Sequence, residues 1–384
     1  MRFAPSDRQR EIRQRFERLF TDELAPAIRR TGGRQVGGPL TEQDARARRL
    51  MWEAMVDLGA VRLGLPAAHG GEDTGLSDAV VLAELAGAAL YQSPLLDTLF
   101  AADLLRGAGP AGARGLDRIA EGATVAVAAR DRGDRTLTEP APMPTDGTVA
   151  MSRRYVPFAA DVDLLLLAGT TPSGLRCGLI PRDDAAVTTT RHEDIAEGDL
   201  YTVDFDPVIG ATGDWIGTPG ALEDAWAAAV SAARIRHAAY LVGLAQGALD
   251  LTVSYARERR QFGQPIGRFQ SLAFRLATAA TDVEAARLLT HHAAWLADSG
   301  GDATMSGLEA VATAGDTARR AAAEAVQIHG AIGMTDDCDA QLFYRRAAID
   351  AAFLGSPARH RREAARFLRE QPSAPAICLD RATA

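Results

Sequence analysis

Lysine is absent from this chain, and all 42 of its basic residues are arginine. The 50 acidic residues outnumber them, so the net charge is −8, and the composition gives no reason to expect binding to nucleic acid or to a membrane surface. Together with the abundance of alanine, the arginine usage is typical of a GC-rich genome and does not indicate a phosphate-binding device. The 384 residues are enough for two or three domains.

Cysteine is scarce, and long apolar runs are missing. Cys177, Cys338 and Cys378 are far apart and show neither CxxC nor His-flanked spacing, so we expect no disulfide framework and no metal site. No stretch approaches the ~20 apolar residues of a membrane-spanning helix. The segment Met1–Arg30 is charged throughout and lacks the apolar core of a signal peptide. We therefore expect a soluble protein of the reducing cytoplasm.

Residues 1–121 are predicted to form an N-terminal helical domain. Ser6 and Gln9 have the spacing of a capping box, and apolar residues follow at helical intervals. Gly32-Gly33 ends this first helix, and Thr41 is suited to cap the next. A third helix is expected over Ser77–Leu90, which is apolar and rich in alanine.

Residues 122–217 are predicted to form a compact β domain, because short β-like runs alternate here with Gly, Pro, Asp and Thr clusters. One of these runs is continuously apolar, and another alternates as a half-exposed strand does. The expected strands are Thr124–Ala129, Asp163–Ala168, Leu175–Ile180 and Leu200–Phe205.

Residues 218–384 are predicted to form a C-terminal helical domain. Three long helices are expected over Leu222–Glu258, Phe269–Asp298 and Ser306–His329, the last ended by Gly330 as C-cap. Long helices with small alanine faces pack as an antiparallel bundle and suit close contact with another subunit. The fold class is therefore α+β: a helical domain, a β domain and a C-terminal four-helix bundle, in an oligomer.

The segment Arg259–Ile266, followed by Phe269 and Gln270, carries the strongest signal for a bound ligand. It reads as the end of a helix meeting a turn at Gly263 and Pro265. Arginine is suited to bidentate contact with a diphosphate, and an exposed aromatic can pack on a flavin or adenine ring. A plain arginine-rich helix C-terminus that satisfies the helix dipole is the alternative.

The segment Gln327–Gly333 is a second candidate, a helix end that opens into a glycine-containing loop. Glycine lets a ligand approach backbone N–H groups, although helix capping by Gly330 alone would also explain the pattern. His329 could take part in catalysis or simply pack at the helix end.

Taken in order along the chain, these segments resemble the flavin-binding signatures of the acyl-CoA dehydrogenase family. The N-terminal stretches Leu58–Pro66 and His69–Gly71 are similar to that family as well, so the resemblance covers essentially the whole chain. It implies FAD as cofactor and an acyl-CoA or acyl-carrier-protein thioester as ligand. It also implies a homodimer, a homotetramer or a heterotetramer with a second family member, and an electron-transfer flavoprotein as a possible partner.

The resemblance assigns roles position by position. Arg259 and Phe262 match contacts to the FAD diphosphate, and Gln270 matches a contact to the FAD of a neighbouring subunit. Arg234 matches an arginine near the acyl thioester. The expected FAD-binding residues are Arg259, Gln261, Phe262, Gln270, Gln327, Ile328, His329, Gly330, Ala331 and Ser356. The expected substrate-binding residues are Arg234 and Gly355.

The chain departs from the family at the catalytic position. Leu354, in Phe353-Leu354-Gly355-Ser356, stands where the family usually has the Glu that removes the proton alpha to the thioester, and leucine cannot accept a proton. Some members carry this base at the position matched by Ala233, and alanine cannot accept a proton either. We therefore predict no catalytic residue in this chain. Asp350, Asp336, Asp337 and Asp339 are alternative acids, but such residues are mostly solvated surface groups.

The segments that would flank the flavin also differ from the family pattern. The family's Trp-Ile-Thr stretch reads Tyr155-Val156-Pro157, which keeps an aromatic residue but loses the hydroxyl. The family's Thr-Glu-Pro-Gly-Ala-Gly-Ser-Asp loop appears only as Thr138-Glu139-Pro140-Ala141-Pro142.

Three functions remain open on this evidence. The chain could be the non-catalytic subunit of a heteromeric dehydrogenase whose partner supplies the base. It could be a flavin-dependent monooxygenase, which needs no α-proton base, or a silent scaffold that keeps only the fold.

Overall fold

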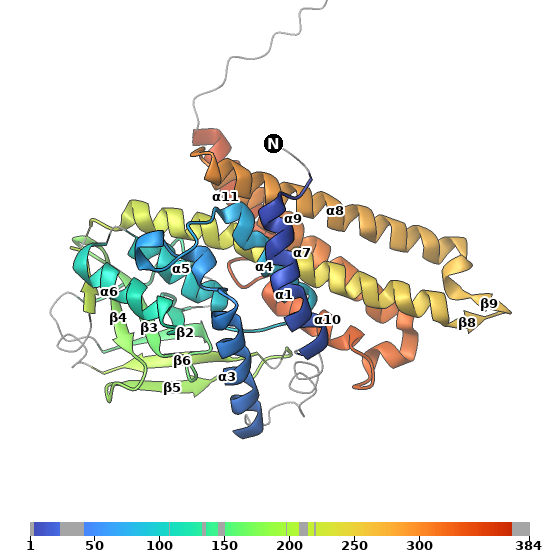
Figure 1. Cartoon of the computed structure of the whole chain (residues 1–384), viewed down its shortest axis with the longest axis horizontal. Coiled ribbons are helices and arrows are strands. Elements are labelled where there is room, and N and C mark those ends of the chain that lie inside the picture. Colours follow the sequence, from blue (N-terminus) through green and yellow to red (C-terminus); the bar gives the residue numbers. More distant parts are fainter. Residues whose placement is uncertain are drawn as a thin grey trace, which may run out of the picture.

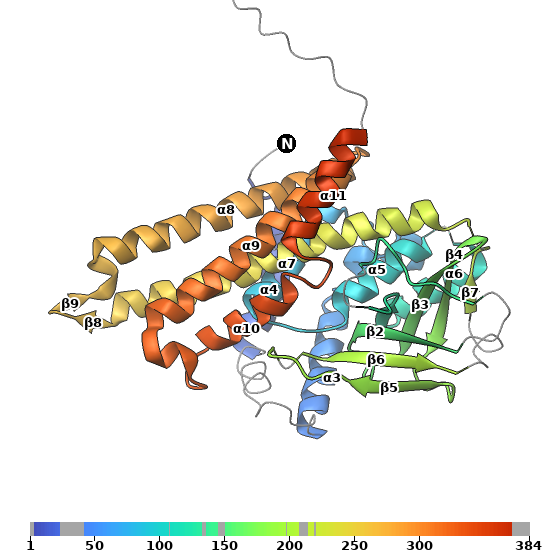
Figure 2. The same ribbon diagram turned by 180° about the vertical axis from the view of Figure 1, so that it is seen from behind.

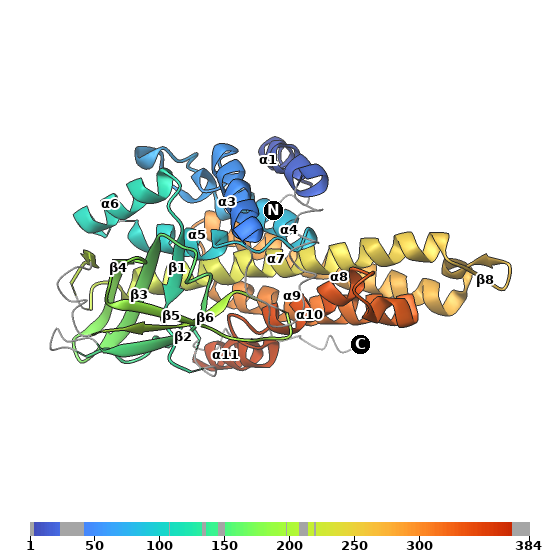
Figure 3. The same ribbon diagram turned by 90° about the horizontal axis from the view of Figure 1, so that it is seen from below.

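The computed structural model describes residues 4–23, 42–106, 108–132, 136–144, 150–196, 198–206, 214–218 and 220–370. Helices at both ends of the chain surround the long helix α7 (Glu223–Glu258), and the two larger β-sheets lie at one end of that helix (Figures 1 and 3). The opposite end of α7 runs into a small hairpin that projects from the molecule (Figure 1).

The N-terminal part is helical, as predicted. The capping box that starts α1 is confirmed, since the Gln9 N–H donates to Ser6 Oγ at 3.1 Å and the Ser6 N–H donates to Gln9 Oε1 at 2.9 Å. Gly32-Gly33 and Thr41 lie outside the described residues. The elements are α1 (Asp7–Arg18), the π-helical turn η1 (Leu19–Glu23), α3 (Glu42–Asp57), α4 (Leu76–Ala88), α5 (Leu95–Leu105) and α6 (Gly109–Ala120), with short 3-10 turns η2 (Arg62–Gly64) and η3 (Ala67–His69).

The middle part forms two small sheets. One has the order β1-β3-β4-β7, with β1 and β3 parallel and the other pairs antiparallel, and the second is antiparallel with the order β2-β6-β5. The four predicted strands correspond to β1, β3, β4 and β6. The strands are β1 (Val125–Ala128), β2 (Met151–Pro157), β3 (Leu164–Thr171), β4 (Gly174–Pro181), β5 (Val187–Arg191), β6 (Leu200–Phe205) and β7 (Asp214–Ile216).

Strand β3 is apolar on both faces because it separates two cores. Leu165 and Leu167 pack between the two sheets, whereas Leu164 and Leu166 belong to the large core shared with the helices. Alternate side chains of a strand point to opposite faces, so a continuous apolar run is what a strand between two cores requires. The β domain thereby becomes one wall of the helical core.

The C-terminal part contains three long helices that match the prediction within a few residues. They are α7, α8 (Gln270–Asp298) and α9 (Thr304–His329), with α10 (Ala340–Asp350) and α11 (Pro357–Glu370) packed along α9 (Figure 2). The hairpin of β8 (Arg260–Gln261) and β9 (Gln264–Pro265), followed by η5 (Ile266–Arg268), joins α7 to α8, and η6 (Gly330–Met334) follows α9. Gly330 has φ +69° at the end of α9, which confirms its predicted role as C-cap.

Helices α4 and α7 cross with their backbones in contact. A methyl group at Gly243 would collide with the carbonyl oxygen of Glu84, and one at Gly87 would collide with that of Tyr240. Glycine on both helices therefore allows a closer approach than alanine would. This crossing sets the position of the α7 residues that line the cavity described next.

Candidate functional site

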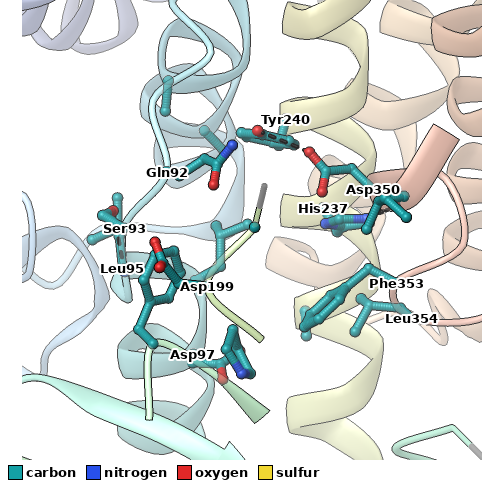
Figure 4. Close-up of a pocket in the computed structure, with 18 of the residues that line it drawn as sticks. Gln92, Ser93, Leu95, Asp97, Asp199, His237, Tyr240, Asp350, Phe353 and Leu354 are labelled. Atoms are coloured by element: carbon teal, nitrogen blue, oxygen red, sulfur yellow. Dashed lines mark hydrogen bonds between the residues drawn. The ribbon is translucent and has the colours of Figure 1, made fainter. Parts of the chain in front are cut away.

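A cavity of about 100 Å³ lies between α4, α5, α7, α10 and the β2 and β6 ends of the β domain. Its walls are mostly apolar, with a few polar groups that converge from opposite sides. In Figure 4, Gln92, Ser93 and Asp97 face Tyr240 and Leu354 across this space. An apolar cavity with a few placed polar groups is the usual form of a ligand site.

Leu354 lines this cavity and is half-buried. Its position is set by the residues that follow it. Gly355 has φ +126°, and a Cβ there would lie 3.1 Å from both the His360 ring and the Thr136 methyl group, so the turn requires glycine. The Arg359 N–H donates to Ser356 Oγ at 3.3 Å, and this hydrogen bond caps α11. Leucine therefore presents an apolar side chain to the cavity at the place where the family pattern has a carboxylate.

Asp350 lies in the wall of the cavity, one helical turn before Leu354, and the expectation that it is a solvated surface acid is wrong. It is buried, and Arg346 donates to its two oxygens at 2.7 and 3.2 Å. The Tyr240 hydroxyl donates to Oδ2 at 3.1 Å. Arg346 sits against the cavity as well. Charge-assisted hydrogen bonds from Arg346 therefore engage both oxygens of this carboxylate.

The aromatic side chains beside Asp350 are neutral. Burial lowers the pKa of His237, whose Nε2 lies 2.7 Å from the backbone carbonyl of Asp350. That carbonyl can only accept, so Nε2 carries the proton. Burial also raises the pKa of the Tyr240 hydroxyl. The loop acids Asp336 and Asp337 are exposed, and neither lines the cavity.

Asp97 is a cavity residue that the sequence did not single out. One of its oxygens, Oδ2, accepts the Val127 N–H at 2.8 Å. Burial raises the pKa of this carboxyl to about 7, against the lowering effects of that hydrogen bond and of Arg130. An acidic residue in the first turn of a helix is usually explained by the helix dipole, so the sequence pattern alone carried no signal for it.

Arg130 is buried just beyond the end of β1 and joins two distant segments. Its guanidinium donates to the carbonyl oxygen of Tyr155 at 2.7 Å and to that of Phe353 at 2.8 Å. It also lies over the Phe353 ring, 4.9 Å from the centroid. Burial lowers its pKa to about 10, although Asp97 opposes this effect.

The predicted FAD-binding residues of the first segment lie at the far end of the bundle. Arg259 is nineteen residues beyond Tyr240, about 28 Å along α7 at ~1.5 Å per residue. Arg259, Gln261, Phe262 and Gln270 are all exposed, and Phe262 is 92% exposed at the hairpin turn.

The second predicted segment meets the first there. The His329 ring stacks on Tyr255 at 4.2 Å, and Ile328 packs with Ile266 in a small separate core. Gln327, Gly330 and Ala331 are exposed beside them. His329 is buried, and its Nδ1 lies 2.7 Å from the carbonyl oxygen of Ala325. Its side chain therefore packs in the interior and hydrogen-bonds the last turn of α9.

The structure thus gathers the predicted residues at two places. The first place, called the bundle tip below, consists of Arg259, Gln261, Phe262, Gln270 and Gln327–Ala331. All of these are exposed except Ile328 and His329, which are buried. The second is the cavity loop with Gly355 and Ser356. Arg234 lines neither: it is buried, and its guanidinium pairs with Glu363 on α11. Its predicted role beside the thioester stays a prediction.

Comparison with known proteins decides the family. Residues 225–368 match the family model described as acyl-CoA dehydrogenase, C-terminal domain. Over 315 residues, covering 80% of this chain and 84% of the relative, the chain is 30% identical to acyl-CoA dehydrogenase IpdE2 of Mycolicibacterium smegmatis. The chain belongs to the acyl-CoA dehydrogenase family.

Several solved structures share this fold along nearly their whole length. Butyryl-CoA dehydrogenase from Megasphaera elsdenii has a TM-score of 0.81 at 20% identity, over 96% of this chain and 100% of that one. An FAD complex of PigA has a TM-score of 0.83 at 20% identity, over 96% and 99%. A variant of the Tcur3481-Tcur3483 steroid ACAD has a TM-score of 0.77 at 25% identity, over 94% and 99%.

FAD is the cofactor of the acyl-CoA dehydrogenase family. The residues of this chain fit FAD only in part. The bundle tip offers exposed arginine, glutamine and phenylalanine side chains that suit a diphosphate and an adenine. The segments expected to flank the flavin ring do not fit in the same way, because Arg130 already bridges them.

No described helix is long and apolar enough to cross a membrane. Within the same residues, no group of His, Cys, Asp and Glu could hold a metal ion.

Proposed function

We propose that this chain is an acyl-thioester-binding subunit of a heteromeric acyl-CoA dehydrogenase and does not itself remove the α-proton. A second family member, which carries the catalytic Glu, supplies the base. The observation that carries the proposal is Leu354, which presents an apolar side chain to the cavity on a turn that its neighbours fix.

The surroundings of Leu354 support this function. A positioned general base contributes roughly 10²–10⁴-fold to such a reaction. Asp350 has both oxygens engaged by Arg346, and Ala233, in the cavity wall, is the other position where the family places a base. Two further carboxylates line the cavity. Asp97 already accepts the Val127 N–H, and Asp199 is buried in an ion pair with Arg48.

The position of the bundle tip supports the proposal that a second subunit is required. When bound, FAD supplies the hydride acceptor of the family's reaction. The residues of this chain that suit its diphosphate and adenylate lie about 28 Å along α7 from the cavity and point outward. They are placed to hold a cofactor shared with another subunit. The steroid ACAD named above is a protein of two differently named chains, which is a precedent for such an assembly.

The ligand we propose is an acyl-CoA or acyl-carrier-protein thioester. The cavity walls are mostly apolar and suit an acyl chain, while Ser93, Gln92 and Asp97 offer hydrogen-bonding groups on one side. An electron-transfer flavoprotein is the proposed acceptor of electrons from the assembly.

Co-expression tests this proposal. The chain is purified alone and together with each Glu-bearing family member of the same genome, and is mixed anaerobically with butyryl-, octanoyl- or palmitoyl-CoA. We expect the visible absorbance of oxidised FAD to bleach only in a mixed assembly. Replacing the partner's catalytic Glu by Gln should slow bleaching by at least about 10²-fold. The exposed-loop variant Asp336→Asn of this chain should leave the rate unchanged.

Two results would decide against the proposal. Bleaching by this chain alone would mean that it carries its own base. Incorporation of an oxygen atom from O₂ into an organic substrate by this chain alone, supplied with reduced flavin by a separate reductase, would favour a monooxygenase.

A further inference from the structure

Arg130 connects the two segments that the family pattern assigns to the sides of the flavin ring. One segment is Tyr155–Pro157 on β2, and the other is Phe353–Ser356 after α10. The guanidinium donates one hydrogen bond to Tyr155 O and another to Phe353 O, at 2.7 and 2.8 Å. A single planar group therefore occupies the space between the two segments and holds them together.

The backbone of β2 is shaped for this contact. The pairing of β2 with β6 shifts register between Arg153 and Val156, so that Tyr155 falls at a β-bulge. Tyr155 also has φ +57°, a left-handed conformation that a bulky residue seldom adopts. A bulge leaves a residue outside the ladder and redirects its groups, and the Tyr155 carbonyl is taken up by Arg130 instead of by the sheet.

Both the main chain and the side chain of Arg130 are held in place. The Arg154 N–H donates to the backbone carbonyl of Arg130 at 2.6 Å, so the main chain of Arg130 is fixed beside β2. The guanidinium lies over the Phe353 ring, 4.9 Å from its centroid, and Phe353 in turn contacts His237 on α7 with 6.0 Å between ring centroids. Two N–H groups of this buried guanidinium thus donate to backbone carbonyl oxygens.

We propose that Arg130 closes the flavin-ring site of this chain. The chain then takes part in FAD binding only through its bundle tip, which holds the diphosphate and adenylate of a FAD whose ring lies in the partner subunit. This inference rests on the proposed function, because it assumes that the partner is a family member with an open ring site.

Titration of the purified full-length chain with FAD tests the proposal without any turnover. The chain is freed of flavin, and binding is followed by quenching of FAD fluorescence and by native mass spectrometry. The variants are Arg130→Ala, which empties the space, and Arg130→Lys, which keeps the charge but lacks the planar fork of the guanidinium. Arg176→Ala is the matched control, because Arg176 stacks on Trp215 at 3.7 Å, on a different strand of the β domain.

We expect the wild type and Arg176→Ala to bind FAD weakly, and Arg130→Ala to bind one FAD per chain at least about tenfold more tightly. Arg130→Lys should show a gain of the same sign, and it replaces Arg130→Ala if the latter does not fold, as judged by circular dichroism.

Two results would overturn the inference. If the wild type binds one FAD per chain tightly and Arg130→Ala weakens that binding, Arg130 is a ligand of the flavin. If neither the wild type nor the variants bind FAD, Arg130 is not what closes the site. Neither result bears on the missing base, which is measured separately by reaction with thioesters, so the two proposals can fail independently.

Discussion

At the scale of single residues, three positions define the site. Leu354 presents an apolar side chain to the cavity, Asp350 is paired with Arg346, and Arg130 places a buried guanidinium between the Tyr155 and Phe353 carbonyl groups. Substitutions of Asp350 and Asp97 test the electrostatics of this site directly.

Asp350→Asn should destabilise the chain by about 3–5 kcal/mol, because it leaves Arg346 buried without its counter-charge. Chemical denaturation measures the free energy of unfolding. The control Asp250→Asn removes an exposed acid that accepts a hydrogen bond from Gln246 and should change stability by no more than about 0.5 kcal/mol. The double variant Asp350→Asn/Arg346→Met should recover much of the loss. An unchanged stability in Asp350→Asn would mean that this pair is not formed.

Asp97→Asn should change how stability depends on pH. Burial raises the pKa of Asp97 to about 7 in the folded chain, whereas an unfolded Asp titrates near ~3.9. The folded chain therefore holds the proton more tightly, so the stabilising contribution is complete below the lower pKa and is lost as the pH rises through the upper one.

Asparagine cannot ionise, so the stability of Asp97→Asn relative to wild type should improve by on the order of 2 kcal/mol between about pH 5 and about pH 8. Urea denaturation at several pH values measures this difference. A difference that stays constant over the range would show that Asp97 titrates normally.

At the scale of elements, the crossing of α4 and α7 sets the position of residues that line the cavity. Gly243→Ala should force α4 and α7 apart, because the new methyl group meets the Glu84 carbonyl, and should cost about 3 kcal/mol or more. Gly307→Ala on α9 is the matched control, since its nearest neighbour would be Ile235 Cγ1 at 3.4 Å. It should be neutral or stabilising by up to about 1 kcal/mol. Equal effects of the two substitutions on the thermal midpoint would contradict the described crossing.

The turn of the β8–β9 hairpin carries strain that we attribute to its function. Phe262 has φ +50° and is almost fully exposed, followed by Gly263 at φ +80°. A left-handed conformation costs a non-glycine residue roughly 1–3 kcal/mol. Phe262→Gly should therefore stabilise the isolated chain by about 1 kcal/mol, yet lower the FAD content of the purified assembly. A variant that retains FAD fully would remove Phe262 from the proposed contact surface.

The elements that could be predicted from sequence were those with a strong, regular pattern. The three long helices of the C-terminal part match within a few residues because their 3.6-residue periodicity runs over many turns. Strand β5 was missed because Val187–Arg191 is mostly polar and lies at the edge of its sheet. Helices α10 and α11 were not delimited either, since each is short and the turn between them lacks an obvious break in pattern.

The site was predictable only where a family pattern exists. The residues at the bundle tip and the loss of the base at Leu354 follow from local motifs. The burial of Asp350, the cavity position of Asp97 and the bridge made by Arg130 depend on segments far apart in the sequence. Phe353, for example, lies 223 residues from Arg130. No local periodicity reports such contacts.

At the scale of the whole molecule, we propose different roles for two surfaces of the chain. The cavity, between the helices and the β domain, is suited to a thioester, and the bundle tip is suited to one end of a cofactor. These surfaces lie far apart along α7, so a single chain does not combine them into one reaction site. This arrangement accounts for a chain that keeps the family's fold and exposed signatures without its base.

The most direct test is the exchange of the α-proton of a bound thioester with solvent deuterium, because it requires a base but no electron transfer. A CoA thioester whose binding has been measured by calorimetry is incubated with the chain in D₂O, and mass spectrometry follows deuterium at the α-carbon. We predict that the chain alone exchanges this proton no faster than buffer, and that the assembly with a Glu-bearing partner does so readily. Exchange by the chain alone that disappears in Asp350→Asn would contradict the account.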